Sequence, residues 1–168
     1  MKVDVYWIPE TKAGKLAIMP RPRGNDWLED ELRAWQRDGI DSIVSLLMPN
    51  EAFGLGLSAE KAICDQLDIK FEQYPIVDRN VPTSKRATVE LAGRINQQLN
   101  NGDGVAIHCR MGMGRSASIV ACVLLMQGMS PRNVFDAIAV ARGVKVPDTP
   151  AQVEWVHALT GDLIQAAN

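Results

Sequence analysis

One stretch of this chain, residues 104–126, constrains the fold more than any other. Residues 104–108 are apolar and bounded by turn-forming residues, which predicts a short buried strand. Residues 116–126 are apolar on nearly every side and long enough for about three helical turns, which predicts a buried helix. The segment between them is therefore expected to be a loop that joins the end of a strand to the start of a helix.

The residue types in this loop are those that bind an anion. Backbone N–H groups at a helix N-terminus attract negative charge, helped by the positive end of the helix dipole. Glycine supplies the backbone freedom that a tight cradle needs, and an arginine supplies a planar guanidinium that binds two phosphate oxygens at once. The predicted phosphate-binding loop consists of Cys109, Arg110, Met111, Gly112, Met113, Gly114 and Arg115.

Cys109 is the candidate nucleophile of this loop. A cysteine at a helix N-terminus beside an arginine can have its pKa lowered from about 8.5 to about 3.5–7.5, so that it is a thiolate at neutral pH. A thiolate beneath a phosphate cradle is placed to attack phosphorus. The alternative is a buried structural cysteine before a helix that happens to begin with arginine, and the two glycines and the arginine of the loop disfavour it.

The order His108, Cys109, five residues to Arg115, then Ser116 resembles the signature of the cysteine-dependent protein tyrosine phosphatases. Chain length and glycine spacing are similar to those of the dual-specificity branch, and residues 19–24 and 27–31 resemble bacterial members. The resemblance implies hydrolysis of phosphate monoesters through a phosphocysteine. It also implies that Ser116 helps to expel the thiolate in the second step, with helix capping as its alternative.

A phosphatase of this kind also needs a carboxylic acid that protonates the leaving oxygen, a contribution of about 10²–10⁴-fold. Asp78 lies in a proline-bounded loop, residues 75–82, directly after an alternating strand pattern. In the resembled family the general acid occupies a comparable loop. Asp78 is therefore the predicted acid, with a solvated turn residue as the alternative.

Three other residues are candidates for supporting roles. His108 is expected to be a buried, hydrogen-bonded residue that orients the loop. Gln152 resembles in position a glutamine that orients water in some tyrosine phosphatases, although its place in a capping box, residues 149–152, explains it without catalysis. Cys64 is a candidate partner for a protective disulfide with Cys109, or more simply a small buried hydrophobe.

Strand patterns alternate with helix patterns along the chain, which predicts an α/β fold: a central, mostly parallel sheet flanked by helices. The predicted strands are residues 3–8, 15–19, 42–47, 69–74 and 104–108. The predicted helices begin near residues 25, 58, 84, 116, 130 and 149. Ligands of such sheets bind beyond the carboxyl ends of the strands, where the Cys109 loop is expected.

Composition predicts one ordinary globular domain over residues 1–168, with 46% hydrophobic and 23% charged residues. A net charge of −2 argues against nucleic-acid and membrane partners. Three unpatterned cysteines favour a reducing compartment, hence the cytoplasm. We expect no signal peptide, no cofactor and no metal, a monomeric state, and phosphotyrosine proteins as substrates, with phosphoserine and phosphothreonine as further targets.

Two other functional classes remain open at this point. A phosphoprotein-binding module with a dead site would have lost a catalytic residue, whereas Cys109, Arg115 and Asp78 are all present. A rhodanese-like sulfurtransferase also has a cysteine loop, but it offers no clear task for Ser116 or Asp78.

Overall fold

The computed structural model describes residues 2–168 and shows an α/β domain around a parallel sheet. The strands are β1 (Lys15–Pro20), β2 (Ser42–Ser45), β3 (Lys70–Gln73) and β4 (Gly104–Cys109), in the order β1-β4-β2-β3. All neighbouring strands are parallel, so the predicted fold class is confirmed. Strand β4 is buried on both faces, which explains why its sequence is a continuous apolar run.

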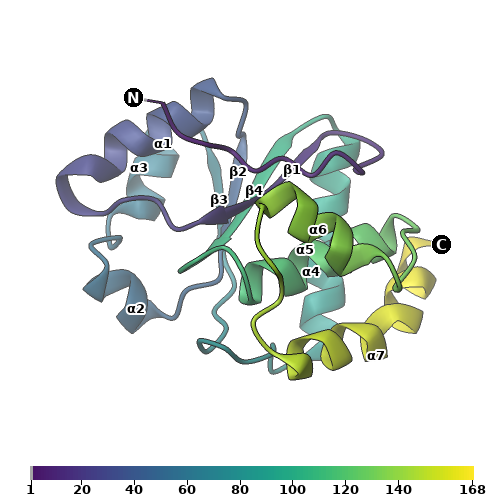
Figure 1. Ribbon diagram of the computed structural model, residues 1–168. Coiled ribbons are helices and arrows are strands. Elements are labelled where there is room, and N and C mark those ends of the chain that lie inside the picture. Colours follow the sequence, from purple (N-terminus) through teal and green to yellow (C-terminus); the bar gives the residue numbers. More distant parts are fainter. Residues whose placement is uncertain (1) are drawn as a thin grey trace.

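Helices cover both faces of this sheet (Figure 1). They are the 3-10 turn η1 (Asn25–Trp27), α1 (Leu28–Arg37), α2 (Pro49–Gly54), α3 (Glu60–Gln66), α4 (Lys85–Asn100), α5 (Arg115–Met126), α6 (Val134–Arg142) and α7 (Pro150–Ala167). Helices α1 and α3 lie on one face, whereas α4 to α7 lie on the other (Figure 1). Helix α5 packs against α4, α6 and α7, and all of its residues are buried, as its apolar sequence predicts.

Successive side chains of β4 point into two different cores, because side chains alternate across a strand. Val105, Ile107 and Cys109 belong to the core that contains α5. Ala106 belongs to the core under α1 and α3, and the ring of His108 meets Trp35 of α1 at a centroid distance of 6.2 Å. Cys109 and His108, the last two residues of β4, therefore pack against helices on opposite faces of the sheet.

Three helix ends follow the chemistry that the sequence indicates. Ser84 caps α4, because its hydroxyl accepts from the Ala87 N–H. Thr149 and Gln152 form the predicted capping box of α7. Gly143 ends α6 in the left-handed conformation with φ 77°, which glycine adopts without strain.

The predicted strand over residues 3–8 is wrong in extent. Only Trp7 forms a bridge, antiparallel to Ala17, although Ile8 donates to the Leu16 carbonyl at 2.8 Å. Pro9 follows at once and begins a turn, and a proline has no N–H with which to extend a ladder. The alternating pattern therefore marks a segment that lies along β1 without becoming a full strand.

Three helices differ from the sequence-based prediction, two in where they begin and one in not having been predicted. Helix α1 begins at Leu28 rather than near residue 25, because a 3-10 turn without a side-chain cap, Asn25–Trp27, precedes it. Helix α6 begins at Val134 rather than at residue 130, because residues 131–133 form a turn first. Helix α2 was not predicted, since a six-residue helix shows too little periodicity to be recognised.

Candidate active site

The predicted phosphate-binding loop lies where β4 ends and α5 begins, at the carboxyl edge of the sheet. Gly112 has φ 67°, and a Cβ there would come within 2.5 Å of the Met19 carbonyl carbon. A Cβ on Gly114 would come within 2.1 Å of an Asp148 carboxylate oxygen. Gly112 is therefore required by its backbone angle and by the close approach of the β1 backbone, whereas a side chain at Gly114 would have to displace the ends of the Asp148 and Gln152 side chains.

Cys109 sits at the base of the loop with 3% of its surface exposed. Its Sγ lies 3.2 Å from the Oγ of Ser116, which is itself fully buried. Helix α5 starts at Arg115 with Gly114 as its cap residue, so Ser116 lies inside the first turn and does not cap the helix. The capping alternative for Ser116 is therefore wrong, and its hydroxyl faces the thiol.

Arg115 is held in a buried position by acceptors from two other segments. Its guanidinium donates to both carboxylate oxygens of Glu51, at 2.7 and 3.0 Å, and to the Ile76 carbonyl at 2.9 Å. Its Nη2 also lies 3.0 Å from Asp78 Oδ1. Burial opposes the charge, but the hydrogen bonds that Arg115 donates to Glu51 and the nearby anions raise the pKa of Arg115 above its ordinary value. Arg115 is therefore a fixed cation.

The pKa of Glu51 is lowered, whereas that of Arg115 is raised. Burial would raise it, but the hydrogen bonds from Arg115 and from the Met48 N–H, together with the charges of Arg115 and Arg110, hold the pKa of Glu51 below its ordinary value. Glu51 thus remains a carboxylate that orients the guanidinium in a bidentate pair.

Asp78 lies on an exposed turn that the structure brings to the loop. The turn is closed by the Asn80 N–H, which donates to the Val77 carbonyl at 3.0 Å, and Arg79 within it has φ 61°. The Asp78 side chain is half exposed and contacts Arg115 as described. Its backbone is tied to α7, because Gln152 Nε2 donates to the Asn80 carbonyl at 3.3 Å. Gln152 therefore supports the Asp78 turn in addition to its capping role.

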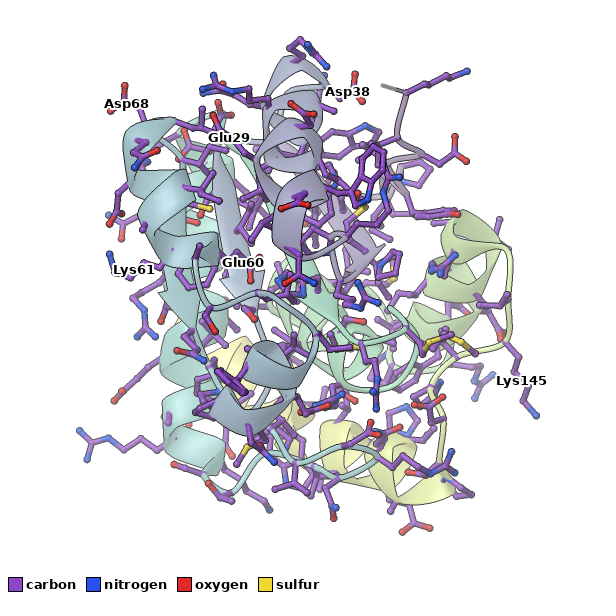
Figure 2. The ribbon with its side chains drawn as sticks, turned by 90° about the vertical axis from the view of Figure 1, so that its left-hand side faces the viewer. Glu29, Asp38, Glu60, Lys61, Asp68 and Lys145 are labelled. Carbon is purple, nitrogen blue, oxygen red and sulfur yellow. The ribbon has the colours of Figure 1, made fainter. Side chains whose placement is uncertain are left out.

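His108 is fully buried and has partners on both ring nitrogens, as expected. Its Nε2 lies 2.8 Å from Glu60 Oε1, and its Nδ1 lies 3.4 Å from the Cys109 carbonyl oxygen. Figure 2 shows Glu60 lying inward near the centre of the view, while the neighbouring Lys61 points outward. A buried chain of contacts thus runs from Glu60 on α3 through His108 to the backbone of Cys109.

The other cysteines lie apart from this chemistry. Burial, and for Cys64 also the charges of Glu60 and Asp65, raises the pKa of both Cys64 and Cys122 to about 12. Cys64 belongs to the core under α1 and α3, whereas Cys109 belongs to the core around α5. The three cysteines are free thiols in the structure, and Cys64 fits the simpler interpretation of a buried small hydrophobe.

The other side chains of the predicted loop differ in exposure, and two basic residues elsewhere in the chain make contacts of their own. Arg110 and Met111 of the loop are exposed, while Met113 packs partly against the core. Arg23 pairs with Glu31 and stacks on Trp27, and His157 bonds to the Pro131 carbonyl on the surface.

Sequence reasoning missed Glu51, Glu60 and Asp148. Glu51 follows the carboxyl end of β2, which is the same position relative to the sheet that singled out Asp78. Glu60 shares a buried helical stripe with Cys64 and Leu67, and an acid in such a stripe indicates a buried partner. Asp148 carried no signal, because only the fold brings it against Gly114.

Two kinds of feature are absent from the described part of the chain. Residues 2–168 contain no group of three or more His, Cys, Asp or Glu side chains that could hold a metal ion. The same residues contain no helix long and apolar enough to cross a membrane.

A parallel sheet with a cysteine, a glycine-containing loop and a buried arginine at its carboxyl edge has the arrangement of the cysteine-dependent phosphatases. A family model described as "Polymorphic toxin system, DSP-PTPase phosphatase" matches residues 17–129. The chain belongs to this family of dual-specificity-type tyrosine phosphatases.

Known proteins show the same relationship. "Putative tyrosine phosphatase 197R" of Invertebrate iridescent virus 6 is 26% identical over 167 residues, covering 95% of this chain and 58% of the viral protein. "Cyclin-dependent kinase inhibitor 3" of Homo sapiens is 30% identical over 94 residues, covering 55% of this chain and 44% of that protein. The chain thus spans about half the length of the curated relatives it matches.

A crystal structure of kinase associated phosphatase, with its catalytic-site cysteine replaced by serine, has the same fold. The TM-score is 0.87 at 20% identity, with 98% of this chain and 97% of that chain covered. The likeness extends over almost the whole domain, which places helices α6 and α7 within the shared fold as well.

Proposed function

We propose that this chain hydrolyses phosphate monoesters of proteins through a phosphocysteine on Cys109. One observation carries the proposal: the thiol and the buried guanidinium of one loop meet a carboxylate from a second segment at the carboxyl edge of the sheet. Asp78 lies 3.0 Å from Arg115 although the two residues are far apart in sequence, and Ser116 lies 3.2 Å from the Cys109 sulfur. Each group has a separate task in phosphoryl transfer.

In the first step the Cys109 thiolate attacks phosphorus, so that an S–P bond forms while the P–O bond to the leaving group breaks. Asp78 gives its proton to the leaving oxygen. Arg115 and the loop N–H groups stabilise the charge on the three remaining phosphate oxygens. Glu51 keeps the guanidinium oriented, while the incoming phosphate replaces Asp78 at Nη2 and leaves the acid free at the mouth of the site.

In the second step Asp78 takes a proton from water as the water oxygen bonds to phosphorus. The S–P bond breaks, inorganic phosphate leaves and the thiolate is restored. The Ser116 hydroxyl donates a hydrogen bond to the departing sulfur, a role supported by the 3.2 Å contact. A sulfurtransferase fits the site less well, because Ser116 and Asp78 would have no clear task in sulfur transfer.

For substrates, we propose phosphotyrosine proteins first, with phosphoserine and phosphothreonine as further targets. Cys109 is buried, whereas Met111 of the same loop and Val77 of the turn that carries Asp78 are 61% and 51% exposed. These apolar side chains can contact the ring of a phosphotyrosine that extends from the buried phosphate. Peptides of one sequence that carry each phosphorylated residue in turn would rank the three substrates by kcat/KM.

We also propose that the protein acts as a cytoplasmic monomer without a metal or cofactor and without nucleic-acid or membrane partners. The three free cysteines and the net charge of −2 support this proposal. Light scattering on the purified protein would test the monomer, and a dimer at micromolar concentration would contradict it.

The mechanism is tested by steady-state hydrolysis of aryl phosphates in EDTA. Cys109→Ser should abolish turnover. Asp78→Asn should lower kcat by about 10²–10⁴-fold, and by more for phenyl phosphate than for p-nitrophenyl phosphate, whose leaving group needs less protonation. Asp136→Asn, an exposed control on α6, should match wild type. Full activity of Cys109→Ser would refute the covalent mechanism, and equal losses on the two substrates would exclude Asp78 as the acid.

A further inference from the structure

Three successive carbonyl groups of the phosphate loop are held from outside the loop. The Arg21 N–H donates to the Arg110 carbonyl at 3.3 Å. Arg142, the last residue of α6, donates from Nη2 to the Met111 carbonyl at 3.0 Å and from Nε to the Gly112 carbonyl at 3.1 Å. One guanidinium therefore fixes two adjoining peptide groups.

The orientation of these carbonyls determines where the loop N–H groups point. In a planar trans peptide the C=O of one residue and the N–H of the next point in opposite directions. The carbonyls of Met111 and Gly112 face Arg142, so the N–H groups of Gly112 and Met113 face away from it. Among the hydrogen bonds within residues 2–168, none uses the backbone N–H of residues 110–114. These donors are available for an anion.

Gly112 makes this external support necessary. Its φ of 67° lets successive N–H groups converge, as in backbone nests that bind anions. A glycine, however, also tolerates a flipped peptide, since it has no Cβ to disfavour other conformations. A flip would turn a carbonyl oxygen toward the phosphate and replace attraction with repulsion. Hydrogen bonds to both flanking carbonyls select the orientation that binds anions.

Arg142 is itself fixed by its surroundings. Its guanidinium stacks on the Tyr6 ring at 4.1 Å, and Tyr6 is tied to β1 because the Ile18 N–H donates to the Tyr6 carbonyl at 3.0 Å. Its positive charge at the C-terminus of α6 is also favoured by the helix dipole. The Arg142 guanidinium is thus held by Tyr6 of the N-terminal segment and by its position at the end of α6.

We infer that Arg142 is a positioning residue that turns the amides of Gly112 and Met113 toward the substrate phosphate. This inference rests on the proposed function for its substrate but concerns anion binding, which can be measured without turnover. Removing one correctly placed donor from an oxyanion site lowers kcat by about 10²–10³-fold. Arg142 acts indirectly on two donors, so a loss of at least about tenfold in oxyanion affinity is expected on its removal.

The test compares tungstate binding by calorimetry in wild type, Arg142→Met, Arg142→Lys and the control Arg132→Met. Arg132 lies exposed just before α6, so its substitution removes the same charge without touching the loop. We expect at least tenfold weaker binding in Arg142→Met, partial recovery in Arg142→Lys, which offers a point donor instead of a fork, and wild-type binding in Arg132→Met.

A second substitution distinguishes loss of the two carbonyl contacts of Arg142 from a general loss of stability. Tyr6→Leu should weaken tungstate binding less than Arg142→Met, because the two carbonyl contacts remain. Unchanged binding in Arg142→Met, at an unchanged melting temperature, would overturn the inference while leaving the proposed hydrolysis intact. If Arg142→Met does not fold, unchanged binding in Arg142→Lys would overturn it equally. The two proposals are tested separately: the activity of Cys109→Ser tests the proposed hydrolysis, whereas the tungstate affinities of the Arg142 variants test the positioning role.

Discussion

At the scale of single residues, the site depends on pairs of groups that fix each other. Glu51 holds both nitrogens of the Arg115 fork, Ser116 faces the Cys109 sulfur, and Glu60 meets His108. Arg115, His108 and Ser116 are all buried, so each needs its partner to offset the loss of water. Removing a partner therefore affects stability as well as chemistry.

Glu51 should make stability depend on acid. Its pKa is lowered in the folded protein, so its stabilising contribution is present above the ordinary glutamate pKa, about 4.3, and is lost as pH falls through the lower folded value. Glu51→Gln should lower the free energy of unfolding by about 1.5–3 kcal/mol at pH 7. Urea unfolding across pH should show this difference shrink below about pH 4. A difference that persists in acid, or one equal to that of the exposed control Glu90→Gln, would contradict the account.

Cysteine reactivity should be confined to one thiol. Burial raises the pKa of Cys64 and Cys122 to about 12, so both stay protonated in the native protein. Brief treatment with iodoacetate should label Cys109 alone, and phosphate should protect it because the anion occupies the loop. Peptide mapping provides the measurement, and labelling of Cys64 at a comparable rate would show that its surroundings are more open than described.

At the scale of elements, β4 distributes its last two side chains to different layers. Cys109 faces α5, which supplies Ser116, whereas His108 faces α1 and α3, which supply Trp35 and Glu60. Helix α3 lies far from the phosphate loop in sequence but reaches its base through this one buried pair. The loop is thus supported from beneath by α3 and from outside by α6.

Breaking the buried pair should reveal the support from α3. Glu60→Ala leaves the buried Nε2 of His108 without its hydrogen-bond partner, which should cost about 1–3 kcal/mol of folding free energy. Glu60→Gln keeps an acceptor and should cost less. Denaturant unfolding measures both, with Lys61→Ala, the exposed neighbour, as the control. Equal small effects for all three variants would mean that the His108 contact contributes nothing to stability.

At the scale of the whole molecule, one parallel sheet brings together segments from most of the chain. Glu51 in α2, just after β2, Asp78 in the turn after β3, and Cys109 at the end of β4 come to the same edge, because parallel strands share the direction of their carboxyl ends. Asp148 before α7 and Gln152 in the first turn of α7 both lie against Gly114 of the loop. The site therefore requires the complete domain rather than one motif.

Features that depend on a local sequence pattern could be predicted from the sequence, whereas features that depend on contacts across the fold could not. The strand, loop and helix around Cys109 were predictable because buried β4 and α5 are long and uniformly apolar. Asp78 was singled out by its proline-bounded loop after a strand and by the family resemblance, and the structure places it 3.0 Å from Arg115, while its role as the acid stays a prediction. Arg142 and Asp148 were not, because their importance comes from contacts across the fold with backbone atoms that no sequence pattern marks. Short elements such as α2, and the bridge at Trp7, depend on packing that periodicity does not record.

The most direct test of the central claim is to observe phosphate on the Cys109 sulfur. Ser116→Ala should slow release of the thiolate more than the first transfer, so that the intermediate accumulates. Rapid acid quench during turnover of phenyl phosphate, followed by mass spectrometry of the digested protein, should show one phosphate on Cys109 in an amount close to that of the enzyme. Product formed without any phosphate on Cys109 in this variant, or phosphate on another residue, would contradict the account.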